Sequence, residues 1–339
     1  MADNSIAAIK NYTRVLDEVY QRESVSACLR SPRRMVRAGR NAKEIMIPKI
    51  EVTGLANYTR NVGYKTGAIT YEFETKTFNY DRGIKLYADV MDVEEAGVLD
   101  CFVEAGSELQ RTQVAPEGDA FTFAQIASHE GVRTSEDDFS TADAEDVLAE
   151  LRAVTSYMDE AQVTAGTRYL FITPTLKGVL DDFSAANPNR SNKVLERFKR
   201  IVEVPQTRFW SHIDLLNAEY GEFGYRCSEG HYVKTADTSI VSGKTYYDYS
   251  KDGYQPVASP VAEDIADYYE IAGVGAPLNF LVVEKSAVIK FDKHVASRVF
   301  SPDELENVDS YMRKYRKYGI VELLDNKLDG VHASCAPIA

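Results

Sequence analysis

Hydrophobic positions follow two different spacings along the 339-residue chain, one typical of helices and one typical of strands. Apolar residues three or four positions apart predict an amphipathic helix over about residues 5–22. From Ile45 onward the spacing becomes two, and residues 69–74 alternate strictly between apolar and polar side chains, which predicts a strand. We expect long strands or hairpins over residues 47–89, with residues 66–80 as the clearest arm. Because an isolated hairpin is marginally stable in water, this arm should need a partner surface.

Two helices are predicted in the middle of the chain. An apolar side marks residues 93–128, and Pro116 should bend or break this helix near Ala115 because proline lacks a backbone donor. Thr141 is expected to cap a second helix that runs to about Gln162. The buried stripe of the second helix should consist of Val147, Leu148, Leu151, Val154 and Met158.

The remaining pattern interleaves strands with helices, which indicates an α+β fold. Residues 168–173 predict a short strand, and Pro174 starts a helix that ends at about Phe183. Residues 234–270, which hold six tyrosines among Thr, Ser, Asp and Gly, predict an inserted β-rich module. Toward the C-terminus we expect a buried strand, an amphipathic helix and a closing hairpin, over residues 278–283, 302–318 and 320–324 with 328–332, respectively.

Composition places the chain among globular proteins, because 44% of its residues are hydrophobic and 27% are charged. No window approaches the roughly 18 apolar residues that a membrane-spanning helix needs, so no membrane partner is expected. The first ten residues lack the basic and apolar regions of a simple export signal. The four cysteines are widely separated, which argues against a disulfide framework or a zinc knuckle and fits a reducing cytosol.

Charge is distributed unevenly along the chain. The net charge of −13 argues against a protein that coats nucleic acid with its whole surface. Residues 1–49 nevertheless hold ten basic and five acidic side chains. Basic residues recur in this stretch at Arg30, Arg33, Arg34, Arg37, Arg40 and Lys43. The stretch is either a basic arm that contacts nucleic acid or an acidic neighbouring subunit, or a solvated arm without a partner, and the sequence leaves both open.

No catalytic or cofactor-binding constellation emerges from the motifs. The five histidines never stand four positions apart, so the sequence lacks a helical metal-binding pair. Residues 243–245 resemble the end of a phosphate-binding loop, but Thr238 occupies the position of its first glycine. Ser211, His212 and Asp214 are too close along the backbone to form a catalytic triad. We therefore predict no enzyme activity, no cofactor, no metal and no small-molecule substrate.

The surfaces of the chain are expected to contact other copies of itself. It is an acidic globular protein without a catalytic site, yet it contains projecting arms and 21 tyrosines, a residue enriched at interfaces. Segments that recur in one known family lie, in chain order, at residues 47–50, 78–83 with Asp89, Asp92 and Glu95, 111–121, 168–174, 204–209, 279–281 and 315–318. By the order and spacing of these segments, the chain resembles the major capsid protein of tailed bacteriophages, with the Hong Kong 97 type fold.

The resemblance implies an α+β capsid fold with an N-terminal arm, an extended β-hairpin loop, a long spine helix, peripheral and axial domains, and a small β-rich insertion. The implied division is the arm at 1–50, the extended loop with flanking strands at 51–90, the spine helix with part of the peripheral domain at 91–142, the axial domain at 143–278 with the inserted module at 234–270, and the return to the peripheral domain at 279–339. The inserted module would be an exposed decoration.

The function implied by the resemblance is structural: self-assembly into the hexamers and pentamers of an icosahedral head that encloses double-stranded DNA. The chain would lie in the virion after assembly in the host cytoplasm. About 45 residues precede the first predicted strand, which favours a separate scaffolding protein. The other expected partners are further copies of the chain, a portal, and packaged DNA bound without sequence specificity.

Two sets of contact residues follow from this interpretation. Contacts between subunits are expected at Tyr64, Lys65, Ile69, Tyr71, Phe73, Asp81 and Arg82. Candidate contacts of the basic arm are Arg30, Arg33, Arg34, Arg37 and Arg40. The alternative within the same fold is the shell protein of an encapsulin-like nanocompartment, and a remote alternative is a cytosolic hydrolase.

Overall fold

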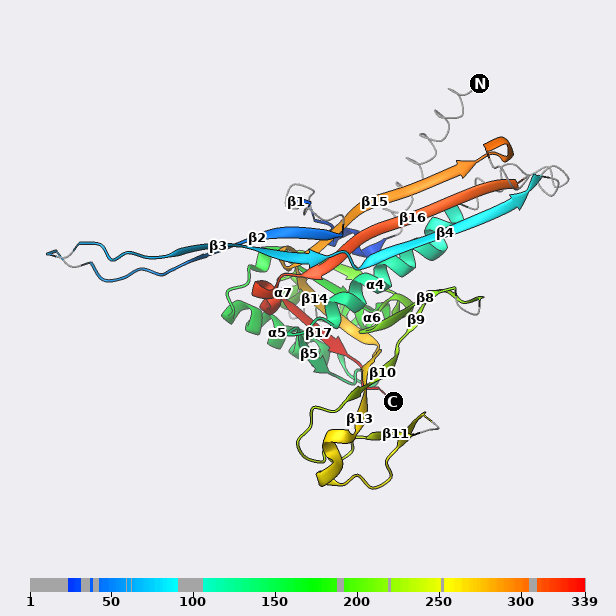
Figure 1. The fold of residues 1–339 in the computed structure, drawn as a ribbon. Coiled ribbons are helices and arrows are strands. Elements are labelled where there is room, and N and C mark those ends of the chain that lie inside the picture. The colour runs from blue at the N-terminus through cyan, green and yellow to red at the C-terminus, as the bar shows by residue number, and fades with distance from the viewer. Residues whose placement is uncertain are drawn as a thin grey trace. The chain divides into compact units, whose positions relative to one another are not determined.

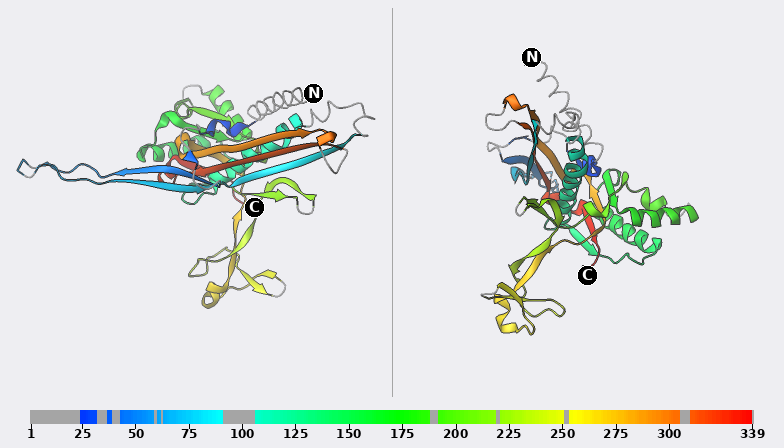
Figure 2. Two further views of the ribbon diagram at one scale, coloured as in Figure 1. Left: turned by 45° about the horizontal axis from the view of Figure 1, so that its top comes forward. Right: turned by 90° about the vertical axis from the view of Figure 1, so that its right-hand side faces the viewer.

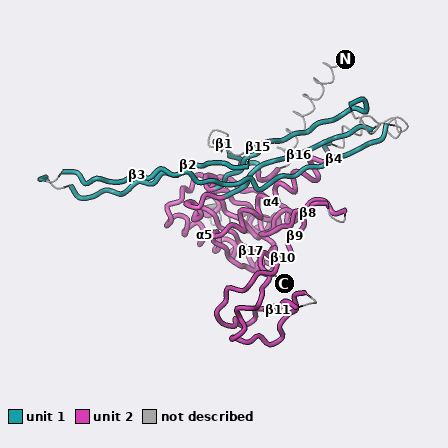
Figure 3. The backbone as a smooth tube through the Cα atoms, in the orientation of Figure 1, with its two compact units in different colours: residues 1–18, 27–107, 288–322 teal, residues 19–26, 108–287, 323–339 magenta. Residues whose placement is uncertain are grey.

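The computed structural model describes residues 24–31, 37–38, 43–58, 60–61, 63–90, 106–187, 192–218, 221–250, 253–304 and 310–338. These residues form two compact units, shown in two colours in Figure 3. Unit 1 combines the described parts of 27–107 and 288–322, and unit 2 combines those of 19–26, 108–287 and 323–339. Each unit is therefore built from segments that are far apart in the sequence. The helix predicted over residues 5–22 lies outside the described residues.

Unit 1 contains two three-stranded sheets (Figure 1). The first sheet has the order β1 (Arg37–Ala38), β2 (Glu44–Val52) and β3 (Ile69–Thr77), and both pairs are antiparallel. The second sheet has the order β15 (Val288–Phe300), β16 (Ser310–Leu323) and β4 (Tyr80–Asp89). The antiparallel pairing of β16 with β4 runs from Ser310 opposite Asp89 to Gly319 opposite Tyr80. The strand predicted from strict alternation is confirmed as β3.

The helix predicted over residues 302–318 is wrong, because most of this stretch belongs to strand β16. A short 3₁₀ turn, η9 (Pro302–Glu304), precedes it. Met312 and Tyr315 are three positions apart and point to opposite faces of the strand, yet both are buried. Burial on both faces removes the regular apolar and polar alternation of a half-exposed strand, so the apolar spacing of β16 imitated that of a helix.

Unit 2 contains a five-stranded mixed sheet. Its order is β5 (Arg133–Glu136), β17 (Val331–Cys335), β14 (Leu278–Glu284), β6 (Arg168–Ile172) and β7 (Arg200–Glu203). The central strand β14 is antiparallel to both neighbours, whereas the two outer pairs are parallel. The closing hairpin predicted over residues 320–324 and 328–332 is wrong, because β17 pairs with β14 and β5. The predicted buried strand at residues 278–283 is confirmed as β14.

Helices cover the sheet of unit 2. They are α4 (Ala115–Ala127), α5 (Ala144–Glu160), α6 (Pro174–Ala186) and the short α7 (Asn192–Leu195). The N-cap of α5 is Asp143 and not the predicted Thr141. The N–H of Asp143 donates to the carboxylate of Asp146 at 3.4 Å. The five residues predicted as the stripe of this helix are all buried.

Strand β6 is buried along its whole length because both faces of the sheet are covered. Leu170 and Ile172 pack into the core that contains the α5 stripe and Phe280 of β14. Phe171 points the other way, and its ring meets Phe123 of α4 at 5.0 Å between centroids. A π-helical turn, η3 (Gln110–Val114), precedes α4, so the helical geometry changes next to Pro116, where the sequence predicted a bend or break.

Two smaller β structures complete unit 2. Strands β8 (Ile213–Asn217) and β9 (Phe223–Cys227) form a hairpin. A four-stranded sheet has the order β10 (Glu229–Lys234), β13 (Tyr269–Val274), β11 (Tyr247–Ser250) and β12 (Gly253–Pro256), which confirms the β-rich content predicted for residues 234–270. Figure 2 shows β10 and β13 as the strands that lead to this module.

Short 3₁₀ turns occur in both units among the described residues. They are η1 (Val25–Leu29), η4 (Ala165–Thr167), η5 (Gln206–Arg208), η7 (Ala262–Asp267), η8 (Lys285–Ala287), η9 and η10 (Asp325–Gly330).

Among the helices of the described residues, none has the length and the apolar composition needed to cross a membrane.

Candidate assembly interface

Strands β2 and β3 form a two-stranded ribbon with one apolar face. Residues that stand opposite each other in an antiparallel pair point to the same side, so the register determines which side chains share a face. Pro48 pairs with Phe73, Ile50 with Tyr71, and Val52 with Ile69. We call these six residues the apolar ribbon face. Its five large hydrophobic members are all at least half exposed, from 50% for Phe73 to 75% for Ile69.

Over the same stretch of the two strands, the other face of the ribbon is polar. Lys49, Glu51, Thr70 and Glu72 alternate with the apolar residues along the two strands. Lys49 binds Glu51 at 2.9 Å, and this hydrogen bond, with the nearby carboxylate charge, raises the pKa of the lysine. Exposed ion pairs add little to stability, so this face is suited to water, whereas the apolar ribbon face is suited to a partner surface.

The loop at the far end of the ribbon also exposes hydrophobic side chains. Leu55, Tyr58 and Tyr64 are all largely exposed, and the rings of the two tyrosines lie 4.9 Å apart. Thr53 ties the two strands together where they leave the loop, because its N–H donates to the carbonyl of Ala68 at 3.1 Å. The exposed apolar surface therefore extends from the ribbon into its loop.

Polar contacts within unit 1 fix the segment that follows the ribbon. Asn79 donates to the carbonyl of Val321 at 2.8 Å and accepts from its N–H at 3.1 Å. Asp81 accepts two hydrogen bonds from the Arg316 guanidinium, at 2.8 and 2.6 Å, which hold the pKa of Asp81 below its usual range. Gly83 stands where a Cβ would approach the carbonyl oxygen of Tyr315 to 2.9 Å, so glycine permits this close strand pairing.

The predicted contact residues fall into two groups. Tyr64, Lys65, Ile69, Tyr71 and Phe73 are all exposed on the ribbon or its loop. Asp81 is bound to Arg316 of its own chain, and Arg82 lies beside it in β4. All seven remain predicted intersubunit contacts.

The basic positions are described only in part. Arg30 binds Asp292 of β15 at 2.6 Å, and Lys317 lies 3.6 Å from the other oxygen of the same carboxylate. Despite its burial, Asp292 has a lowered pKa because these cations surround it. Arg37 lies in β1, whereas Arg33, Arg34 and Arg40 lie outside the described residues.

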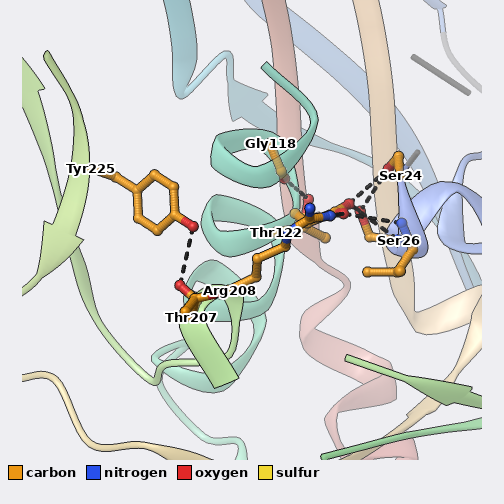
Figure 4. A network of polar contacts seen from close by, with 9 residues as sticks. Ser24, Ser26, Gly118, Thr122, Thr207, Arg208 and Tyr225 are labelled. Carbon is orange, nitrogen blue, oxygen red and sulfur yellow. Dashed lines mark hydrogen bonds and ion pairs between the residues drawn. The ribbon is translucent and has the colours of Figure 1, made fainter. Parts of the chain in front are cut away.

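A buried carboxylate in unit 2 organises a second polar site, which Figure 4 shows from close by. Asp119 on α4 is fully buried. It accepts hydrogen bonds from the Ser24 hydroxyl at 2.7 Å and from the N–H groups of Val25 and Ser26 at 3.0 and 3.1 Å, and the Ser26 hydroxyl donates to it as well. Arg208 supplies the compensating positive charge at 3.4 Å. Asp119 therefore anchors the segment at residues 24–26 to α4.

A Ser, His and Asp cluster in the five-stranded sheet does not have the geometry of a catalytic triad. The Ser135 hydroxyl donates to Asp137 at 2.6 Å and lies 3.2 Å from Nε2 of His332. Nδ1 of His332 is buried and has no hydrogen-bond partner among the described residues, so no carboxylate orients the imidazole as a general base. Burial, aided by the nearby positive charge of Arg133, lowers the pKa of His332 to about 4.

The β-rich module has a small core of its own. Tyr246, Ile265 and Tyr268 are buried against one another. The Tyr246 hydroxyl donates to Asp237 at 2.8 Å, and the Lys244 ammonium binds Asp237 at 2.6 Å and also Glu270. These carboxylates raise the pKa of Lys244, so the lysine stays charged and the three groups form an ion-pair network.

In the described part of the chain, no three His, Cys, Asp or Glu side chains gather in a way that could hold a metal ion. The sequence did not predict the role of Asp119. The sequence feature that could have indicated this role is the charge of Asp119 within the buried helix α4, because its chain neighbours Gly118 and Ala120 are also buried.

Comparison with known proteins shows which solved structures are similar to this chain. No family model and no curated protein matches the sequence. The capsid of the cyanophage P-SCSP1u is similar, with a TM-score of 0.54, 13% sequence identity, and coverage of 89% of this chain and 86% of that chain. A virus-like particle from Pyrococcus furiosus gives a TM-score of 0.52 at 9% identity, with coverage of 96% and 98%. The mature capsid of bacteriophage PhiM1 gives 0.50 at 14% identity, with coverage of 88% and 83%.

The chain therefore has the fold of phage capsid proteins, and the prediction of an α+β capsid fold is confirmed. This fold is consistent with the predicted Hong Kong 97 type.

Proposed function

We propose that this chain is the major capsid subunit of a tailed phage and that it assembles into the hexamers and pentamers of an icosahedral head. The observation that carries this proposal is the apolar ribbon face, which is exposed in the single chain. The fold supports it, because the similar phage structures are capsids.

The assembly would be driven by covering the apolar ribbon face and the loop beside it with a neighbouring copy. Removing apolar surface from water contributes about 25 cal/mol per Å². Part of that gain offsets the loss of translational and rotational freedom on association. Contacts that repeat head to tail and close into rings generate capsomers, so one ribbon per chain suffices to link every copy to the next.

The interior of the head would hold double-stranded DNA, and the basic arm would contact it through salt-sensitive, sequence-independent interactions. A separate scaffolding protein and a portal are further proposed partners. Assembly would take place in the host cytoplasm before the chain becomes part of the virion.

A second candidate function keeps the fold but replaces the genome with protein cargo, as in an encapsulin-like nanocompartment. One observation supports this candidate: the chain is similar to a virus-like particle from Pyrococcus furiosus, and the similarity covers 96% of this chain. Two of the three similar structures above are phage capsids, which favours the phage head.

Electron microscopy of the recombinant chain, with and without the candidate scaffolding protein, tests the proposal. We expect closed shells or capsomers from the full chain. A variant in which two glycines replace residues 54–67 removes the exposed loop and keeps β2 and β3, and it should yield subunits that do not close into shells. A chain that stays monomeric at every concentration, or a loop variant that forms shells of normal size and yield, would contradict the proposal.

A further inference from the structure

The β-rich module presents two sheet faces of different chemistry. One face covers the core of Tyr246, Ile265 and Tyr268. Tyr247 and Tyr269 directly follow the core residues Tyr246 and Tyr268 in the chain, so their side chains point to the opposite face of the sheet. The register pairs Tyr247 with Tyr269 and Tyr249 with Tyr254 on that opposite face. Tyr232 of β10 joins them, because its ring packs on those of Tyr247 and Tyr254. We call Tyr232, Tyr247, Tyr249, Tyr254 and Tyr269 the tyrosine face.

The rings of the tyrosine face hold one another in place. Tyr232 and Tyr254 stack at 3.9 Å between centroids with an interplanar angle of 9°. Tyr249 and Tyr269 both pack against the Tyr254 ring, at 5.0 and 5.1 Å. A surface of mutually packed rings loses little side-chain freedom when a ligand binds, so it is preorganised for recognition.

The tyrosines of the tyrosine face differ from those of the module core in the hydrogen bonding of their hydroxyl groups. In the core, Tyr246 donates to Asp237, and Tyr268 accepts from the N–H of Val261 at 3.2 Å. On the tyrosine face, none of the five hydroxyls has a hydrogen-bond partner within the described chain. Tyr249 is 63% exposed and Tyr232 is 37% exposed. The face therefore offers ring surface together with free donors and acceptors.

Charge and ring geometry narrow the class of ligand. Residues 229–274 contain eight acidic and three basic residues, so the module repels nucleic acids and other polyanions. The close stack of Tyr232 on Tyr254 leaves no slot between these rings for a proline ring, which disfavours a proline-rich peptide. A neutral sugar presents C–H surfaces that stack on aromatic rings and hydroxyls that pair with those of tyrosine.

We propose that the tyrosine face binds neutral polysaccharide. Lys234 and Asp267, which lie 3.6 Å apart, form a charged pair next to Tyr269 and offer further hydrogen bonds to sugar hydroxyls at the rim. The proposal does not rest on shell formation, because the tyrosine face belongs to a module that has a core of its own.

Native gel electrophoresis of the full chain in gels that contain dextran, soluble starch or laminarin tests the proposal. Retardation by at least one of these three neutral polysaccharides is expected for the wild-type chain. Tyr249→Ser and Tyr254→Ser should each raise the apparent dissociation constant at least fivefold, and Tyr249→Phe should have a smaller effect because it removes only the hydroxyl. Val261→Ser, which changes an exposed apolar side chain of the module outside the tyrosine face, should bind as the wild type does.

Hydrogen exchange of β10 and β13 in each variant shows that the module still folds, and electron microscopy of the same variants reports shell formation separately. Absence of retardation on all three polysaccharides would overturn the proposal, as would equal retardation of wild type and both serine variants. Association of the wild-type chain that Tyr249→Ser abolishes, without polysaccharide binding, would assign the face to a second copy and overturn the proposal as well.

Discussion

Ile50 and Tyr71 stand directly opposite each other across the β2–β3 ribbon, and their side chains remain 61% and 54% exposed. The pair lies in the middle of the apolar ribbon face, between the pairs of Pro48 with Phe73 and Val52 with Ile69. Apolar side chains in such a row are stabilised when a partner covers them. Substitutions on this face should therefore separate assembly from the folding of the subunit.

Replacing the aromatic pair of the ribbon should abolish assembly. The rings of Tyr71 and Phe73 meet edge to face at 5.1 Å and are both exposed. Tyr71→Ser with Phe73→Ser should change the free energy of unfolding of the subunit by less than about 1 kcal/mol. The same double variant should lower the yield of sedimenting shells at least tenfold, because aromatic side chains dominate the energetics of interfaces.

Glu72→Gln is the matched control for this variant, because Glu72 lies between the two aromatic residues on the polar face of the ribbon. It should assemble as the wild type does. Equal shell yields from the double variant and the control would show that the apolar ribbon face does not hold neighbouring copies together.

Loss of the Asp119 charge should destabilise unit 2. Asp119→Asn keeps the shape of the side chain but replaces one acceptor oxygen by a donor that would face N–H groups and the Arg208 guanidinium. We expect the free energy of unfolding in urea to fall by about 2–4 kcal/mol. Asp182→Asn on the exposed side of α6 is the control and should change it by less than about 0.5 kcal/mol. A similar stability for both variants would contradict the anchoring role of Asp119.

The burial of His332 should make the subunit sensitive to acid. Its pKa is about 4 in the folded chain, below its ordinary value of 6.5, because burial disfavours the charged imidazolium. Between these two pH values the unfolded chain takes up a proton that the folded chain does not, so stability falls as the pH is lowered from 6.5 to 4. The loss should amount to about 2–4 kcal/mol.

Urea unfolding of the wild type and His332→Gln at pH values from 4 to 7 measures this effect. Glutamine does not titrate, so the variant should show a shallower dependence of stability on pH in this window. Parallel curves for the two proteins would assign the acid sensitivity to other groups.

The ion-pair network of the β-rich module should stabilise that module alone. Lys244→Met leaves the carboxylates of Asp237 and Glu270 close together without their shared cation. Hydrogen exchange should become at least threefold faster in β10, β11 and β13 and stay unchanged in β14. Faster exchange throughout the five-stranded sheet would show that the module is not an independent folding unit.

The sequence predicted those elements whose pattern is local. Strict alternation at residues 69–74 predicted β3, and the apolar stripe from Val147 to Met158 predicted α5, because in each case one face is buried and the other is exposed. Strand β16 was mistaken for a helix because burial on both of its faces removes that contrast.

The buried site on α4 could not be predicted for a different reason. Asp119 is stabilised by Ser24 and Ser26, which are 95 and 93 positions away in the chain. No pattern within a short window links an aspartate to partners at that separation. The strand that carries Ile69, Tyr71 and Phe73 was predicted from its alternation, and the structure shows these side chains exposed, whereas their contact with another subunit stays a prediction.

The most direct test of the assembly account is a cryo-electron microscopy reconstruction of the particles formed by the recombinant chain. We expect Ile50, Tyr71 and Phe73 to be covered by side chains of an adjacent copy at every quasi-equivalent position. A closed shell in which these side chains remain open to solvent would contradict this expectation.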